Sequence, residues 1–125
     1  MKVLVTGAAG QIGSELIDYL RNRYSVEDVI ASDINPQTSE KIQQSGPFEF
    51  ADCTDYNEMQ KIIKKYQITI IYHLAAILSA SAEKNPQLAW NVNINGLYAV
   101  LELAREYNCA VFVPSSIGAF GPTTP

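Results

Sequence analysis

The sequence predicts an α/β fold, a doubly wound parallel sheet with helices on its two faces. Short apolar runs, typical of strands, alternate with segments of helical apolar spacing along the 125 residues. Strands separated by helices pair in parallel, and right-handed crossovers then give a doubly wound sheet. The run Ile68-Thr69-Ile70-Ile71-Tyr72 is apolar on both faces, as is typical of a central parallel strand.

The elements follow in the order strand, helix, strand from the first residues onward. We predict strands over 2–6, 28–32, 48–51, 69–73 and 110–114. Helices are expected over 11–23, 55–66 and 86–107, with a further turn of helix near 36–44. Pro36 and Gly46 break the most polar and loop-like stretch of the chain. The sheet is thus expected to stop after its fifth strand, and residues 121–125 to form a loop.

The turn between the first strand and the first helix is rich in glycine. Gly7, Gly10 and Gly13 have the spacing of turns that hold a dinucleotide pyrophosphate. Glycine leaves no Cβ to block a phosphate, and the unpaired N–H groups at the helix start stabilise its charge. Gly13 lies on the helix side, where a missing side chain lets helix and sheet pack closely. A purely structural tight turn is the alternative, and the strand–turn–helix context favours the dinucleotide site.

Asp33 ends the second apolar run, Val29-Ile30-Ala31-Ser32, twenty residues after Gly13. An acid at this place accepts hydrogen bonds from the hydroxyls of the adenosine ribose. Its charge also repels a 2′-phosphate, so we expect NAD rather than NADP as the cofactor. A turn-forming role before Pro36 is the alternative. Together with the glycine turn, Asp33 predicts a Rossmann-type NAD-binding domain over residues 1–125.

Composition and charge exclude several other classes of protein. With 125 residues, 47% of them hydrophobic, the chain is expected to form one domain with its own core. A formal net charge of −4 argues against nucleic-acid binding, and no apolar run is long enough for a membrane span. The chain begins with a strand rather than a signal segment, so we expect a cytoplasmic protein. Cys53 and Cys109 lack pairing or metal-ligand spacing, so free thiols and no metal site are expected.

Five short motifs follow one another along the chain. They are Thr6-Gly7-Ala8-Ala9-Gly10-Gln11-Ile12-Gly13, Ala51-Asp52, His73-Leu74-Ala75-Ala76, Asn93-Ile94-Asn95-Gly96 and Val113-Pro114-Ser115-Ser116-Ile117-Gly118-Ala119-Phe120-Gly121. Together they resemble the motifs of the extended short-chain dehydrogenase/reductase family, the NAD-dependent epimerase/dehydratase superfamily. The resemblance implies a cofactor site that includes the glycine turn with Gln11 and Ile12, Asp52 and Cys53 after the third strand, and Leu74, Ala75 and Ala76 after the fourth. From the residues alone, Asp52 could equally belong to the N-cap of the next helix.

Within that family, the nearest likeness is to the short-chain type of L-threonine 3-dehydrogenase, carried by residues 75–86 and 114–125. The likeness implies that NAD accepts hydride from the β-carbon of L-threonine, giving 2-amino-3-ketobutyrate. It also implies that Ser116 contacts the substrate and polarises the reacting oxygen, with Ser115 and Ser79 as further substrate-binding residues. Read by itself, a serine at a strand end can simply satisfy loop amides.

The sequence departs from the family in one respect. The family's general base is the tyrosine of a Tyr-x-x-x-Lys pair, in which lysine lowers the pKa of the phenol. No tyrosine of this chain has a lysine four residues later; Tyr19 precedes Arg23, and Tyr107 precedes Val111. We therefore expect the N-terminal part of a longer enzyme, inactive by itself. The parent enzyme is expected to be a homodimer.

Three alternatives remain open from the sequence. A sugar-nucleotide epimerase or dehydratase of the same superfamily would oxidise its sugar only transiently and release no NADH. A non-catalytic NAD-binding module would account for the missing Tyr-x-x-x-Lys pair. A methyltransferase also joins a glycine-rich turn to an acid, but the spacing of the three glycines argues against it. His73, the single histidine, is expected to make a structural hydrogen bond rather than to act in catalysis.

Overall fold

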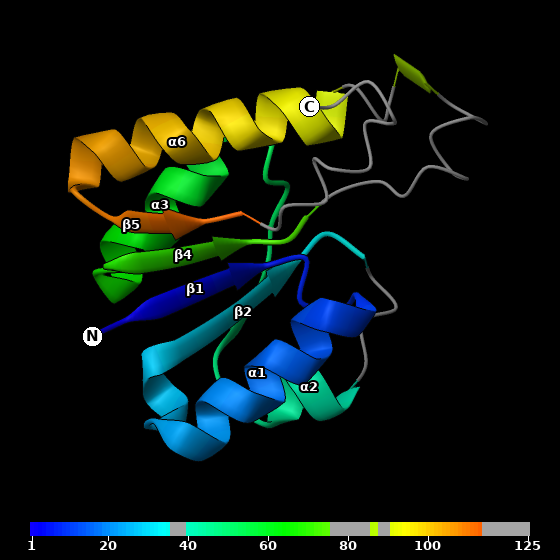
Figure 1. Ribbon diagram of the computed structural model, residues 1–125, viewed down its shortest axis with the longest axis vertical. Coiled ribbons are helices and arrows are strands. Elements are labelled where there is room, and N and C mark those ends of the chain that lie inside the picture. Colours follow the sequence, from blue (N-terminus) through cyan, green and yellow to red (C-terminus); the bar gives the residue numbers. More distant parts are fainter. Residues whose placement is uncertain (36–39, 76–85, 88–90, 114–125) are drawn as a thin grey trace, which may run out of the picture.

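The computed structural model of the chain describes residues 1–35, 40–75, 86–87 and 91–113. Its centre is one five-stranded sheet in the order β3-β2-β1-β4-β5, and every neighbouring pair is parallel (Figure 1). The strands are β1 Val3–Thr6, β2 Val29–Asp33, β3 Phe48–Phe50, β4 Ile70–His73 and β5 Ala110–Phe112. The predicted fold class and all five predicted strands are confirmed.

Helices connect the strands in the expected places. They are α1 Gln11–Arg23, a 3₁₀ turn Val26–Asp28, α2 Glu40–Gln44, α3 Tyr56–Tyr66, a π-helical turn Asn91–Asn95 and α6 Gly96–Tyr107. The prediction of one continuous α-helix over 86–107 is wrong in its first part, because residues 91–95 have π-helical hydrogen bonding. Asparagine favours helix interiors less than most residues do, and three of the five residues in this turn are asparagines, which agrees with the departure.

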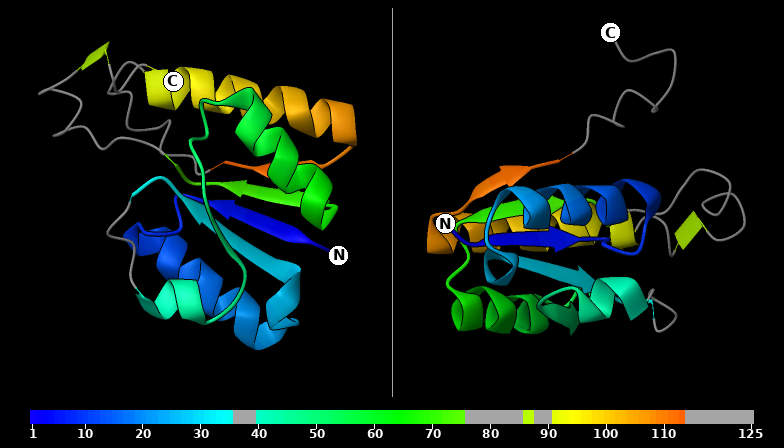
Figure 2. Two further views of the ribbon diagram at one scale, coloured as in Figure 1. Left: turned by 180° about the vertical axis from the view of Figure 1, so that it is seen from behind. Right: turned by 90° about the horizontal axis from the view of Figure 1, so that it is seen from below.

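The two sides of the sheet are covered by different helices. One cluster of buried residues joins one face of β1, β2 and β4 to α3 and α6: Leu4, Ile30, Ala51, Cys53, Met59, Ile62, Ile63, Ile68, Ile71, Val100, Leu103 and Ala104. The other cluster joins the opposite face to α1 and α2: Val3, Val5, Ala8, Ile17, Leu20, Val29, Ala31 and Ile42. Opposite views show α1 and α3 on different sides of the strands (Figures 1 and 2). Successive side chains of β1 point to opposite faces of the sheet, Leu4 to one cluster and Val3 and Val5 to the other, so the whole strand is buried.

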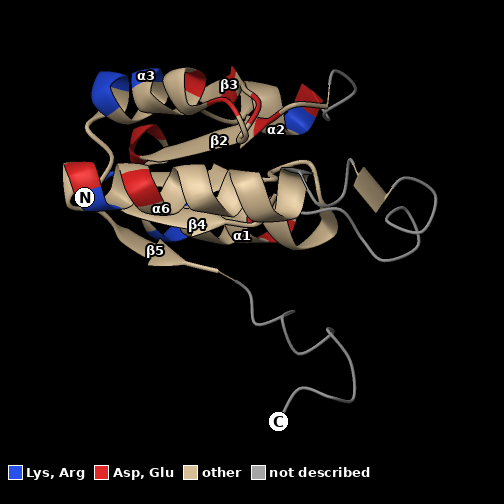
Figure 3. Cartoon of the chain, turned by 90° about the horizontal axis from the view of Figure 1, so that it is seen from above, with Lys and Arg blue, Asp and Glu red and all other residues tan. Residues whose placement is uncertain are grey.

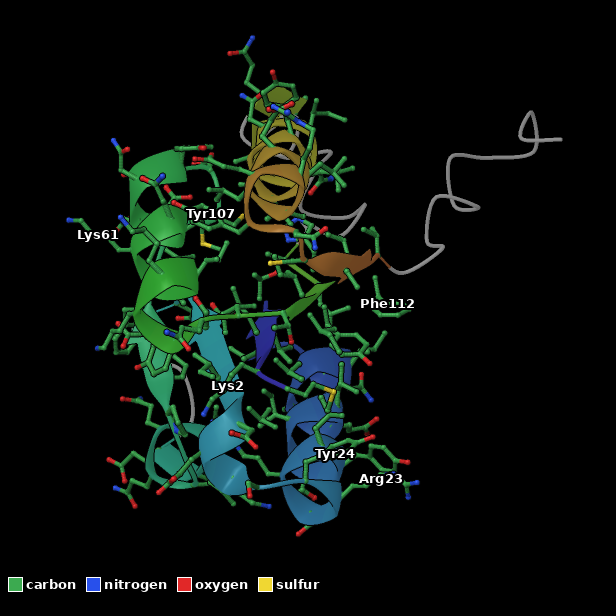
Figure 4. The ribbon with its side chains drawn as sticks, turned by 90° about the vertical axis from the view of Figure 1, so that its left-hand side faces the viewer. Lys2, Arg23, Tyr24, Lys61, Tyr107 and Phe112 are labelled. Atoms are coloured by element: carbon green, nitrogen blue, oxygen red, sulfur yellow. The ribbon has the colours of Figure 1, made fainter. Side chains whose placement is uncertain are left out.

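Contacts between α3 and α6 hold this helix pair together at their outer ends. The side chain of Gln60 on α3 donates a hydrogen bond from Nε2 to the Tyr107 hydroxyl on α6, 2.9 Å away, and Tyr107 lies between the two helices in Figure 4.

Lys61 and Lys64 are exposed on α3, and Lys65 pairs with Glu49 at 3.0 Å. These lysines thus form a solvated face of α3. Among the described residues, no helix is both long and apolar enough to cross a membrane.

The order of the strands places a crevice at the middle of the sheet. From β1 the chain moves outward to β2 and β3, then returns across the sheet to β4 and β5. Thr6 at the end of β1 therefore lies between Ser32 of β2 and His73 of β4. The order of the strands switches direction at this point, and doubly wound sheets bind ligands at such a switch.

Candidate functional site

A cleft with a volume of about 420 Å³ opens at this crevice, within the usual size range of ligand sites. It is lined by Thr6, Gly7, Gly10, Ser32, Asp33, Ile34, Ala51, Asp52, Cys53, Thr54, Leu74, Ala75 and Val92. These residues come from the ends of β1 and β2, from the loops that follow β1, β2, β3 and β4, and from the π-helical turn. Most of the described residues that the sequence assigns to the cofactor are among them.

Gly7 and Gly13 are required by the conformation of the turn itself, whether or not a ligand is bound. Gly7 has a φ of 70°, in the left-handed region, and a Cβ there would lie 2.7 Å from the backbone nitrogen of Ala75. A Cβ at Gly13 would lie 2.2 Å from the carbonyl oxygen of Gly7. We expected Gly13 to permit close packing of helix on sheet; its closest neighbour is instead the carbonyl of the turn itself.

Gly10 differs from the other two glycines, because its Cα faces open space. The nearest atom to a Cβ at this place would be the Gly7 carbonyl oxygen at 3.4 Å, an ordinary contact. Gly10 is also the N-cap of α1, and no side chain caps the helix there. Gln11 and Ile12 in the first turn are exposed. The positive end of α1 is thus open to an anion, and a phosphate can approach its N–H groups.

Asp33 connects the end of β2 with the glycine turn. Its Oδ2 accepts a hydrogen bond from the Ala9 backbone nitrogen at 2.9 Å, and its Oδ1 accepts one from the Asn35 nitrogen at 2.8 Å. The half-buried carboxylate lines the cleft, where its remaining lone pairs can accept from ribose hydroxyls. Asp33 therefore has a second role that the sequence did not indicate, since it also fixes the phosphate-binding turn.

Asp52 lies in the cleft but does not cap a helix. Its Oδ1 accepts hydrogen bonds from the backbone nitrogen and the hydroxyl of Thr54, at 2.9 and 2.7 Å. The N-cap of α3 is Asp55, whose side chain accepts from the nitrogens of Asn57 and Glu58. The capping alternative for Asp52 is thus wrong, because a residue three positions later performs it. Contact of Asp52 with the adenine stays a prediction.

Cys53 lies behind Asp52 on the wall formed by α6. Burial, with the charge of Asp52 as a smaller cause, raises the pKa of its thiol to about 11, so the thiol is neutral near pH 7. Its sulfur lies so close to α6 that a Cβ at Gly96 would approach it to 2.8 Å. Cys53 and Cys109 are both free, as expected. This geometry suits Cys53 for packing beside a ligand rather than for nucleophilic chemistry.

The opposite wall is the loop after β4, which begins with Leu74 and Ala75. The hydroxyl of Thr6 accepts hydrogen bonds from their backbone nitrogens at 3.1 and 3.3 Å, and lies 2.8 Å from Nδ1 of His73. His73 is buried, and burial lowers its pKa to about 4. His73 thus makes the hydrogen bond that was expected of it. Thr6 was missed as a site residue, although its place directly before Gly7 could have indicated a role.

Four residues that the sequence assigns to the site lie outside the described part of the chain. They are Ala76, Ser79, Ser115 and Ser116. Their roles in binding cofactor and substrate stay predictions.

The sequence profile of the NAD dependent epimerase/dehydratase family matches residues 3–125. This chain belongs to that family. Proteins of Staphylococcus aureus that are known only as uncharacterized epimerase/dehydratases are 48% identical to it over 124 residues, which cover 99% of this chain and 39% of theirs. The chain thus spans about two fifths of the length of these relatives.

Solved structures similar to this family member fall into two groups. An L-threonine dehydrogenase from Clostridium difficile has 51% identity and a TM-score of 0.92, over 99% of this chain and 39% of that one. A GalE-like L-threonine dehydrogenase from Cupriavidus necator, in its holo form, has 48% identity and a TM-score of 0.88, over 100% and 40%. A UDP-glucose 4-epimerase from Thermus thermophilus, in complex with NAD, has 30% identity and a TM-score of 0.76, over 86% and 35%.

NAD is the cofactor of this family, and the cleft fits it. The open end of α1 and the bare Cα of Gly10 suit the pyrophosphate, and the Asp33 carboxylate suits the adenosine ribose. Leu74 and Ala75 line the part of the cleft where we expect the nicotinamide half of NAD to lie. The assignment of each residue to its part of NAD stays a prediction.

The different surroundings of Gly10 and Gly13 predict different effects of the same substitution. Gly10→Ala should lower the free energy of unfolding by at most about 1 kcal/mol, yet weaken NAD binding about tenfold or more, because the methyl group meets the phosphate. Gly13→Ala should cost about 2 kcal/mol or more by overlap with the Gly7 carbonyl. Urea denaturation and calorimetric titration with NAD measure the two quantities. Equal NAD affinity in Gly10→Ala and the unsubstituted protein would contradict the phosphate assignment.

The two roles of Asp33 can be separated with two substitutions. Asp33→Ala removes the acceptor for Ala9 as well as the charge, and should weaken NAD binding more than tenfold. Asp33→Asn keeps one amide oxygen as an acceptor, so its loss of NAD affinity should be smaller. Both should narrow the preference for NAD over NADP, measured as the ratio of the two dissociation constants. A preference that survives both changes undiminished would show that the ribose assignment is wrong.

Proposed function

We propose that the whole protein that carries this chain oxidises L-threonine at its β-carbon with NAD, producing 2-amino-3-ketobutyrate. The chain supplies the dinucleotide site and part of the substrate loop. The assignment of residues 1–125 as an NAD-binding domain and a cytoplasmic location belong to the same proposal.

The observation that carries this proposal is the difference in similarity between the two groups of structures. Six L-threonine dehydrogenases share 41–51% identity with the chain, whereas two UDP-glucose 4-epimerases share 28–30%. All of these structures share the fold of this chain, so the higher identity supports the threonine dehydrogenase branch beyond the common fold. The sequence likeness of residues 75–86 and 114–125, after β4 and β5, supports the same branch.

In the proposed reaction, the residues of this chain bind and orient rather than remove the proton. The N-terminus of α1 holds the pyrophosphate, and Asp33 holds the ribose. Ser116 donates a hydrogen bond to the reacting oxygen, with Ser115 and Ser79 at the substrate. When bound, NAD supplies the hydride acceptor. The proton is taken by a tyrosine of a Tyr-x-x-x-Lys pair, which the 125 residues do not include.

The epimerase or dehydratase alternative keeps a specific observation in its favour. The fold of the chain also matches that of UDP-glucose 4-epimerases, with TM-scores of 0.76 and 0.81. A fold shared between activities does not decide between them.

An assay of the whole protein with L-threonine and NAD tests the proposal. We expect net formation of NADH, followed by its absorbance, and about a 10²-fold lower kcat in Ser116→Ala because the donor to the reacting oxygen is lost. The 125 residues produced alone should form no NADH. UDP-glucose with NAD is the matched control, because an epimerase would convert it without accumulating NADH. Conversion of UDP-glucose with no activity on L-threonine would overturn the proposal in favour of the epimerase.

We further propose that the whole protein is a homodimer that uses the outer side of α6. Ile94, Tyr98 and Leu101 are 40%, 66% and 48% exposed, and they lie at helical spacing on one side of this segment. The first half of α6 carries no charged residue (Figure 3). An uncharged, exposed stripe of this kind is typical of an interface.

Substitution of Tyr98 tests the dimer. In the whole protein, Tyr98→Glu should shift sedimentation from dimer towards monomer, because it places a charge in the apolar stripe. Tyr19→Glu is the matched control, since Tyr19 is also exposed, at 58%, but lies on α1. A related L-threonine 3-dehydrogenase from a metagenome is monomeric, so the unsubstituted protein must be measured as well. A monomer at all concentrations would refute the dimer.

A further inference from the structure

The Thr6 hydroxyl is the meeting point of three groups from the β4 side of the cleft. Its oxygen lies 3.1 Å from the nitrogen of Leu74, 3.3 Å from the nitrogen of Ala75 and 2.8 Å from Nδ1 of His73. Thr6 and His73 are 2% and 4% exposed, so water does not compete for these bonds. The partners lie 67 to 69 residues away along the chain.

The number of donors around this hydroxyl decides the direction of each bond. A backbone nitrogen can only donate, so the Thr6 oxygen accepts from both Leu74 and Ala75; the Leu74 nitrogen is shared with the Thr6 carbonyl oxygen at 3.2 Å. A hydroxyl has two lone pairs and one proton, so its proton remains for His73. Nδ1 must therefore accept, and the imidazole carries its hydrogen on Nε2. The lowered pKa of His73, about 4, keeps this nitrogen unprotonated near pH 7.

The consequence lies at the glycine turn. Leu74 and Ala75 approach the turn so closely that a Cβ at Gly7 would be 2.7 Å from the Ala75 nitrogen. The Thr6 hydroxyl binds these two amides, and the backbone of Gly7 lies against the same two residues. If the hydroxyl turned its proton towards the amides, donors would face donors and the loop would have to move away.

We propose that His73 is a positioning residue for the cofactor site, which acts by accepting the Thr6 hydroxyl proton and so fixing the loop of Leu74 and Ala75 against the glycine turn. It contacts neither hydride nor substrate in this role. The inference deepens the proposed function by assigning one more residue to the NAD site. Its effect on NAD affinity rests on that function, whereas the direction of the hydrogen bond does not.

The direction of the hydrogen bond between Thr6 and His73 can be measured in the unsubstituted protein. In the full natural chain, ¹⁵N chemical shifts of the imidazole report which nitrogen carries hydrogen, and the His73→Asn variant identifies the signals by their loss. We expect a neutral ring with hydrogen on Nε2 and a bare Nδ1 from pH 8 to pH 6. Hydrogen on Nδ1, or a charged ring, would overturn the proposal whether or not the protein binds NAD.

Two substitutions of His73 separate positioning from packing. Asn places Oδ1 where Nδ1 lies and can accept the same proton, whereas Leu has the same branching and no acceptor. His73→Leu should weaken NAD binding about tenfold, as expected for buried groups left unpaired, and His73→Asn by only about twofold. Equal losses in the two variants, or no loss in His73→Leu, would refute a role through the hydrogen bond.

A Thr6→Val variant tests whether His73 acts through Thr6. It keeps the shape and removes the hydroxyl, so it should weaken NAD binding about tenfold and leave little further effect for His73→Leu. Additive losses would overturn the proposal. Thr69→Val is the matched control: its hydroxyl also connects β4 with β1, through the nitrogen and oxygen of Lys2 at 3.2 Å, but at the far end of the sheet. It should leave NAD affinity unchanged.

Amide hydrogen exchange at Leu74 and Ala75 gives a readout that needs no NAD. Slow exchange in the unsubstituted protein should become faster in Thr6→Val and His73→Leu, but not in Thr69→Val or His73→Asn. Unchanged exchange in both of the first two variants would refute the proposal. If the unsubstituted protein binds no NAD, the proposed function fails alone. If His73→Leu does not fold, the Thr6→Val variant and the imidazole ¹⁵N shifts still test the proposal.

Discussion

The cleft depends on a close approach between two pieces of backbone. The turn after β1 and the loop after β4 lie so near that only glycine fits at position 7, where a Cβ would overlap the Ala75 nitrogen at 2.7 Å. This approach occurs at β1, where the strand order switches: β2 and β3 lie on one side of β1, and β4 and β5 lie on the other. The strand order opens the crevice. The absence of a side chain at Gly7 allows the turn after β1 to lie this close to the loop after β4.

Side chains at the ends of the central strands satisfy the backbone groups that this arrangement leaves without secondary-structure partners. Thr6 accepts from two amides of the β4 loop, and Asp33 accepts from Ala9 in the glycine turn and from Asn35. The amides of Ala9, Leu74 and Ala75 are half-buried, and leaving them without an acceptor would cost free energy, so these bonds stabilise the rims of the cleft. Thr6 and Asp33 also line the cleft. The described part of the site is therefore formed by groups that also complete the hydrogen bonding at the carboxyl ends of the strands.

Such a site explains why dehydrogenases and epimerases share this part of the fold. The described rims of the cleft offer an open helix end, a carboxylate and backbone amides, which suit a dinucleotide irrespective of the reaction. The proposed choice of L-threonine rests instead on the sequence likeness to threonine dehydrogenases in residues 75–86 and 114–125, which follow β4 and β5.

The sequence by itself determined the sheet and the position of the glycine turn after its first strand. Strand and helix positions follow from apolar spacing, and the places of Gly7 and Asp33 at the ends of the first two strands follow from motif spacing, because both signals are local. The roles of these two residues toward NAD stay predictions. Tertiary structure decided what joins distant residues: the bond of Thr6 to His73, the second role of Asp33, and the contact of Cys53 with Gly96. It also decided that Asp55 caps α3 and that a π-helical turn precedes α6. Hydrogen-bond partners 67 residues apart leave no periodic trace in a sequence, since only the register of β1 against β4 brings them together.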